Sequence, residues 1–120
     1  MLRTLLYSKI HRATVTGACV DYEGSLSIDK HFLEAVDMRP YEKILVGNLH
    51  NGQRFETYAI EAEAGSGEIV LNGAAAHLGA KGDRLIIMSY CQLTEEEMKN
   101  HVPKRIVLGA NNEIIDRKGC

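Results

Sequence analysis

Short strand-like segments separated by glycine and asparagine run through most of the chain, and this punctuation constrains the fold more than any other feature. Closely spaced short strands are typical of a small sandwich or barrel. Residues 43–49 and 53–60 flank Asn51-Gly52, a pair that favours a type I′ hairpin turn because both central residues of that turn adopt positive φ. Further strands are predicted at residues 2–10, 13–20, 68–71, 84–90 and 105–108.

Two short helices are expected at the margins of the sheet. Asp29 is a suitable N-cap for a helix over residues 30–36. Thr94 and Glu97 have the spacing of a capping box, which predicts a second helix that ends before Pro103. The first helix carries one apolar stripe, made of Phe32, Leu33 and Val36.

The expected architecture is therefore a mainly β single domain over residues 1–120 with short flanking helices. Residues 84–88 are apolar on both faces, so they are expected near the centre of the sheet. Closing the sheet into a barrel would remove the exposed edges that invite aggregation. The periodicity of the sequence leaves the barrel topology open.

Composition argues against several classes of partner. Lys and Arg total 14 against 16 Asp and Glu, so no strong field draws in nucleic acid or a membrane surface. No apolar run approaches the roughly 20 residues of a membrane helix, and residues 1–6 lack the parts of a secretory signal. Three cysteines without a Cys-x-x-Cys pair suit a reducing compartment, and the histidines lack paired metal spacing. A cytoplasmic protein without a metal site is expected.

The segment Tyr22-Glu23-Gly24-Ser25 is the most informative for chemistry, and it is predicted to be a loop. Gly24 can adopt backbone angles closed to other residues, and the Ser25 hydroxyl adjoins the Gly24 carbonyl. Such an arrangement permits an N-to-O acyl shift if the peptide is strained and its carbonyl oxygen is held by donors. Taken alone, a Gly-Ser pair is far more often an ordinary turn.

Motifs elsewhere in the chain change the interpretation of this segment. Several motifs occur together along the chain, which are Leu2-Arg3-Thr4, Lys9-Ile10-His11-Arg12, Tyr22-Glu23-Gly24-Ser25, Asn51-Gly52, Arg54-Phe55, Thr57-Tyr58-Ala59-Ile60, Asn72-Gly73-Ala74-Ala75-Ala76-His77 and Gly82-Asp83. Their order and spacing make the chain, from about residue 2 to residue 117, resemble the aspartate 1-decarboxylase family. That resemblance implies a double-psi β-barrel that assembles as a homotetramer with active sites between subunits.

The resemblance implies that the chain cuts itself between Gly24 and Ser25 into a 1–24 β chain and a 25–120 α chain. Ser25 would become a covalent pyruvoyl group, whose ketone forms a Schiff base with the substrate amine and whose amide carbonyl accepts the electrons left by decarboxylation. No metal and no pyridoxal phosphate are then needed. The implied reaction converts L-aspartate to β-alanine and carbon dioxide for pantothenate and coenzyme A synthesis. The rate of processing and the need for a maturation factor stay open.

Lys9 and His11 alternate along a predicted strand, so they share one face with Tyr7. By resemblance Lys9 meets a substrate carboxylate; the alternative is a solvated lysine. The resemblance places His11 near the processed site, whereas a strand histidine is equally often a packing or hydrogen-bonding residue.

Arg54 and Tyr58 are four residues apart on one face of a predicted strand, and a planar guanidinium suits a bidentate grip on a carboxylate. By resemblance Arg54 binds the substrate and Tyr58 returns the proton after decarboxylation. Without the family, a surface arginine and a half-buried aromatic would be favoured. The resemblance links Thr57 to the cleavage step, although a regular strand points it to the opposite face. Thr57 therefore serves a neighbouring subunit's site or lies at a local bend.

Small residues follow Asn72 at a possible helix start, where exposed backbone N–H groups suit a carboxylate or oxyanion. By resemblance Tyr22 neighbours the cleavage point; the alternative for the small residues is tight packing against a strand. Gly47 departs from the family, in which a large aromatic helps to wall the pocket, so strict preference for aspartate is open. By resemblance, the residues that line the site here are Asn72, Gly73, Ala74 and Ala75.

Two other classes of function compete with the decarboxylase. A non-catalytic oligomeric β-barrel would bind a small anion through Lys9 and Arg54 and would stay a single chain. A serine hydrolase would use Ser25, but the Gly-x-Ser-x-Gly elbow and a legible acid–base–nucleophile arrangement are missing.

Overall fold

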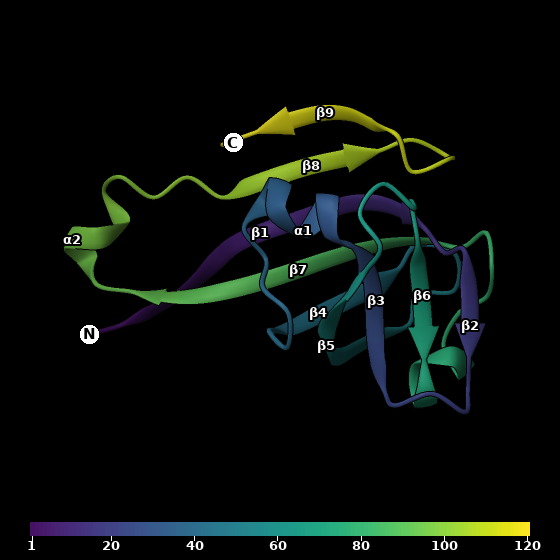
Figure 1. The fold of residues 1–120 in the computed structure, drawn as a ribbon. Coiled ribbons are helices and arrows are strands. Elements are labelled where there is room, and N and C mark those ends of the chain that lie inside the picture. Colours follow the sequence, from purple (N-terminus) through teal and green to yellow (C-terminus); the bar gives the residue numbers. More distant parts are fainter.

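The computed structural model describes all residues from 1 to 120 and shows a nine-stranded sheet with three short helices (Figure 1). The strand order is β2-β6-β3-β5-β4-β7-β1-β8-β9. The helices are α1 (Lys30–Val36), the 3-10 helix η1 (Gly73–His77) and α2 (Glu95–Met98). The strands are β1 (Arg3–Thr14), β2 (Gly17–Cys19), β3 (Ser25–Asp29), β4 (Lys43–Asn48), β5 (Arg54–Ala62), β6 (Ile69–Asn72), β7 (Arg84–Leu93), β8 (Lys104–Leu108) and β9 (Ile114–Lys118).

The connection between β1 and β2 forces the sheet to curl. Only residues 15 and 16 join the two strands, yet β2 is the first strand in the order and β1 the seventh. Val15 N donates to Asp83 O at 2.8 Å, and Thr16 N donates to Ile69 O at 2.8 Å, so this short connection is bonded to both regions. The prediction of a mainly β protein, with a small barrel and short flanking helices, is confirmed.

The curled sheet encloses one apolar core. Nineteen buried apolar residues form a single cluster, and all but Val15 and Met38 come from the strands, α1 and η1. Strand β7 lies between β4 and β1, as its apolar sequence predicts. Burial of this surface is the main favourable term in folding. No helix in the structure has the length and apolar character needed to cross a bilayer.

The predicted hairpin forms, but its turn is of a different type. Strands β4 and β5 pair antiparallel from Lys43 opposite Tyr58 to Gly47 opposite Arg54. Gly52 has φ of 76°, whereas Asn51 keeps a negative φ, so the type I′ prediction is wrong. The Asn51 amide instead donates to Leu78 O at 3.0 Å, a tertiary contact that sequence spacing does not reveal.

Strand boundaries near the N-terminus also differ from the prediction. Residues 11 and 12, expected to interrupt two strands, lie inside a continuous β1, which absorbs register irregularities between Leu6 and Ser8 and between His11 and Ala13. Strands β3 and β9 were not predicted. Strand β3 is short, and β9 is almost entirely exposed, so neither has a long apolar pattern.

Both helix starts are confirmed by their caps. The Asp29 carboxylate accepts from His31 N at 2.8 Å, and the predicted stripe of α1 is buried. Thr94 and Glu97 form the capping box of α2. That helix has only four residues, because none of its side chains is buried and packing does not extend it towards Pro103.

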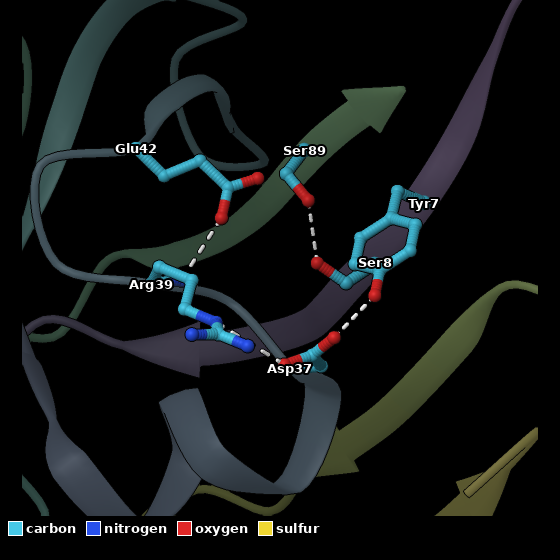
Figure 2. A network of polar contacts seen from close by, with 6 residues as sticks. All are labelled: Tyr7, Ser8, Asp37, Arg39, Glu42 and Ser89. Atoms are coloured by element: carbon cyan, nitrogen blue, oxygen red, sulfur yellow. Dashed lines mark hydrogen bonds and ion pairs between the residues drawn. The ribbon is translucent and has the colours of Figure 1, made fainter. Parts of the chain in front are cut away.

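A polar network fastens α1 to β1 (Figure 2). The Tyr7 hydroxyl donates to the carboxylate of Asp37, which caps the C-terminus of α1, and this bond raises the pKa of Tyr7 to about 12. Asp37 also lies 3.5 Å from Arg39, whose backbone N donates to Glu42 at 2.9 Å. Tyr7 is therefore engaged with α1, and it does not line the pocket that Lys9 and His11 share.

Candidate active site

Ser25 is the first residue of β3 and is fully buried, so the prediction of a loop holds only up to Gly24. Its hydroxyl donates to Glu23 O at 3.0 Å and accepts from the Asn72 side-chain amide at 3.1 Å. Asn72 stands directly opposite Ser25 in the β3–β6 ladder, and its amide also donates to the Ser27 hydroxyl at 2.9 Å. One buried amide thus orients two hydroxyls, and the Ser25 oxygen is fixed beside the peptide that precedes it.

Gly73 determines how the segment before Ser25 is seated. It has φ of 64°, and a Cβ built on it would lie 2.7 Å from Gly24 Cα and 2.8 Å from Gly24 N. Glycine is required here by both the backbone conformation and the close approach. Gly24 itself has no positive φ, so it does not use the conformational freedom that glycine offers at this position. The conformationally demanding residue is Gly73.

A pocket of about 490 Å³ opens beside Ser25. Tyr58 lines it because β5 alternates regularly, which puts Tyr58 and Ile60 on the same face of the strand. The predicted residues Tyr22, Ser25 and Tyr58 therefore share one pocket. The complete lining is Tyr22, Glu23, Ser25, Pro40, Tyr41, Tyr58, Ile60 and Glu61.

Tyr41 is a pocket residue that sequence reasoning missed. Its ring centroid lies 6.3 Å from that of Tyr58, and its backbone N donates to Ala59 O at 2.7 Å. The φ of Tyr41 is 70°, so a strained backbone holds the ring in this place. An exposed tyrosine after Pro40 carries no sequence signal for such a position.

Thr57 lies on the other face of β5. The residues two positions away on the same face of the strand are Phe55, which packs against the core, and Ala59, which is buried. The register of β5 against β4 is regular through Thr57, so the alternative of a local bend is wrong. Within one chain, Thr57 and Tyr58 face opposite sides of the strand.

Lys9 and His11 share one face, as predicted, but they line a different pocket of about 240 Å³ between β1, β8 and β9. His11 Nδ1 is buried without a hydrogen-bond partner. Burial, followed by the positive charges of Lys9, Arg12 and Arg84, lowers the pKa of His11 below its ordinary value of 6.5. The structure of one chain therefore separates Lys9 and His11 from Ser25.

Arg54 also lies outside the Ser25 pocket. It is exposed at the start of β5 opposite Gly47, and a Cβ on Gly47 would lie 3.5 Å from Arg54 Nη1. Of the small residues after Asn72, Ala74 is exposed and Ala75 belongs to the apolar core.

The Ser25 pocket carries only negative charge. Glu23 and Glu61 are its only charged residues, so a ligand with carboxylates finds no cation among the residues of this pocket in one chain. No group of three or more His, Cys, Asp or Glu side chains is arranged to hold a metal ion.

Comparison with known proteins assigns the family. A family model described as aspartate decarboxylase matches residues 1–115. Aspartate 1-decarboxylase 1 of Gloeobacter violaceus is 56% identical over 115 residues, which cover 96% of this chain and 98% of that protein. The aspartate 1-decarboxylases of Dehalococcoides mccartyi and Staphylococcus aureus are each 54% identical, covering 95% and 97% of this chain and 92% and 91% of their own lengths. This chain belongs to the aspartate decarboxylase family.

Proposed function

We propose that the protein converts L-aspartate to β-alanine and carbon dioxide, after cutting its own chain between Gly24 and Ser25. Family membership supports the reaction. The observation that carries the self-cleavage is the buried Ser25 hydroxyl, which the Asn72 amide orients at the wall of a pocket. β-Alanine made in this way would supply pantothenate and coenzyme A synthesis in the cytoplasm.

The residues around Ser25 fit the formation of a pyruvoyl group. The Ser25 oxygen attacks the Gly24 carbonyl carbon, so a C–O ester bond forms as the C–N peptide bond breaks. Elimination then removes the Ser25 Cα proton and breaks the Cβ–O bond, which forms a Cα=Cβ double bond at residue 25 and leaves a free carboxylate on Gly24. Hydrolysis of the resulting dehydroalanine releases ammonia and leaves the 25–120 chain with a pyruvoyl end. Asn72 orients the attacking oxygen, and Gly73 leaves room for the Gly24 backbone.

When formed, the pyruvoyl group supplies the electron sink for loss of carbon dioxide. The other steps fall to side chains of this pocket. The Tyr58 phenol lines it and is suited to return a proton to the substrate carbon. Tyr22 and Ile60 narrow the space around Ser25, and exclusion of water strengthens the electrostatic interactions inside it.

A second copy of the chain would complete the site. The Ser25 pocket contains two glutamates and no cation, whereas Lys9 lies in another pocket and Arg54 lies outside both. A dicarboxylate substrate needs cations, because burying an unpaired carboxylate is costly. We therefore assign Lys9, Arg54, Thr57 and the Asn72–Ala75 segment to sites shared between neighbouring subunits of a homotetramer. A maturation factor that accelerates the cut is compatible with this scheme.

Intact-mass spectrometry of Ser25→Ala, Ser27→Ala and the unchanged protein tests the proposal. The unchanged protein should give a 1–24 fragment and a 25–120 fragment lighter by one ammonia than hydrolysis alone would leave. Ser25→Ala should stay one chain and release no carbon dioxide from aspartate. Ser27→Ala, which removes the other hydroxyl held by Asn72, should still be cut. An active, uncut Ser25→Ala protein would refute the mechanism.

A further inference from the structure

Three cations form a row across neighbouring strands at one end of the sheet. Lys9 of β1 stands opposite Arg105 of β8 in the parallel pair, and Arg105 stands opposite Lys118 of β9 in the antiparallel pair. All three line the pocket of about 240 Å³, so their side chains share one face. Like charges directly opposite one another destabilise a sheet.

The chain does not compensate this row internally. None of the five ion pairs in the structure includes Lys9, Arg105 or Lys118. Arg117 adds a fourth cation to the pocket lining, against the single carboxylate of Asp116. The whole chain has a formal net charge of −2. The local positive charge therefore arises because the fold brings these cations together, and not because the chain is basic.

His11 lies two residues from Lys9 on β1 and lines the same pocket. Its Nδ1 atom is buried and has no hydrogen-bond partner within the chain, but it is not accessible from the pocket. The indication of a ligand therefore comes from the cations, whose positive charge an anion in the pocket would neutralise.

We propose that the Lys9–Arg105–Lys118 row binds a compact oxyanion of the phosphate class, either inorganic phosphate or the phosphate group of a small metabolite. Adjacent strands lie about 4.8 Å apart, so the three side chains arise from strands that span roughly 10 Å. This span suits one phosphate or pyrophosphate. The guanidinium of Arg105 offers a planar fork for two oxygens, and the two lysines add rotatable charges. A lone carboxylate would leave most of the positive charge uncompensated.

Binding at this row would compete with the substrate. This part rests on the proposed function, which assigns Lys9 to a substrate carboxylate in a shared site. An oxyanion held by Lys9, Arg105 and Lys118 occupies the lysine that the substrate needs. Phosphate is therefore expected to raise the apparent KM for aspartate and to leave kcat unchanged.

Isothermal titration calorimetry on the full protein tests the binding directly, with inorganic phosphate and then pyrophosphate at constant ionic strength. Saturable binding is expected, and Arg105→Gln and Lys118→Gln should each weaken it about tenfold or more, because each removes a charged hydrogen-bond donor. Lys81→Gln removes the same charge from an exposed turn outside the pocket and should bind like the unchanged protein. Arg105→Lys keeps the charge, loses the fork and should bind with intermediate affinity. Circular dichroism verifies that every variant is folded.

Several results would overturn the proposal. One is an absence of saturable phosphate binding, and another is a loss of phosphate affinity in Lys81→Gln as large as in the pocket variants. A third is succinate binding as tightly as phosphate, which would indicate a carboxylate site instead. The kinetic experiment is separate, and in Lys118→Gln phosphate should no longer raise KM. An enzyme that binds phosphate but lacks decarboxylase activity would contradict the proposed function and support the anion site. Binding without any change in KM would refute the competition through Lys9.

Discussion

Gly73 lies so close to Gly24 that a β-carbon on Gly73 would approach the Gly24 Cα to 2.7 Å. This contact joins the end of β6 to the segment that precedes Ser25. The backbone geometry at Gly73 is therefore expected to affect the proposed cleavage between Gly24 and Ser25.

Gly73→Ala should therefore impair both stability and processing. The left-handed backbone costs a non-glycine residue about 1–2 kcal/mol, and the added methyl group must also displace the Gly24 backbone. Gly52→Ala is the matched control, because Gly52 has a similar φ of 76° and open space around it. Both variants should unfold more easily, but only Gly73→Ala should accumulate uncut chain in a time course followed by intact mass. Equal cleavage of the two variants would contradict the role of the contact.

Asn72→Ala should slow the cut and destabilise the fold. The change leaves the Ser25 and Ser27 hydroxyls without their amide donor, which costs about 1–3 kcal/mol when the groups are buried. Asn51→Ala removes an exposed asparagine amide that donates to Leu78 O, and it should leave cleavage unchanged. Urea unfolding and the rate of appearance of the 1–24 fragment measure the two effects. If the Asn72 variant matures at the normal rate, its amide does not orient the nucleophile.

Tyr58→Phe should separate maturation from catalysis. The phenol lines the Ser25 pocket, and general acid catalysis typically contributes about 10²–10⁴-fold to a rate. The variant should be cut normally and lose kcat within that range, as measured by carbon dioxide release from aspartate. Tyr41→Phe tests the neighbouring ring, 6.3 Å away, and should keep most of its activity. Full activity in Tyr58→Phe would assign the proton to another group.

Stability should fall as the pH is lowered through the range of His11. Burial and the nearby positive charges lower the pKa of this imidazole in the folded chain, so the unfolded chain binds the proton more readily. The stabilising effect of the neutral form is complete above the ordinary pKa of 6.5 and is lost as the pH falls towards the lower folded value. Thermal unfolding from pH 7.5 to 5 should show a smaller decline in His11→Gln. Exposed His77→Gln should decline like the unchanged protein.

The elements that sequence predicted well are those set by neighbouring residues. Asp29 caps α1, Thr94 and Glu97 form a capping box, and the chain reverses near Gly52, because each signal acts within a few positions. The type of turn at Asn51 was missed because its side chain bonds to Leu78, far along the chain.

The sequence allowed the residues of the candidate site to be predicted, but not where the fold places them relative to one another. Ser25 and Tyr58 do share a pocket, but β3 was not predicted because its burial comes from β5 and β6 on either side. Lys9 lies elsewhere because β8 and β9 form its surroundings, and no spacing rule relates residue 9 to residues 105 and 118. The need for glycine at position 73 arises from the approach of Gly24, which only the folded chain shows.

The place of β1 in the sheet has a consequence for any chain cut after Gly24. Strand β1 pairs with β7 on one side and β8 on the other, β2 pairs with β6, and Ile10, Ala13 and Val15 are buried in the core. The 24-residue piece would thus remain as a structural subunit that completes the barrel by strand complementation. Losing it would mean losing the core, so unfolding would become a dissociation, with a midpoint that rises with protein concentration.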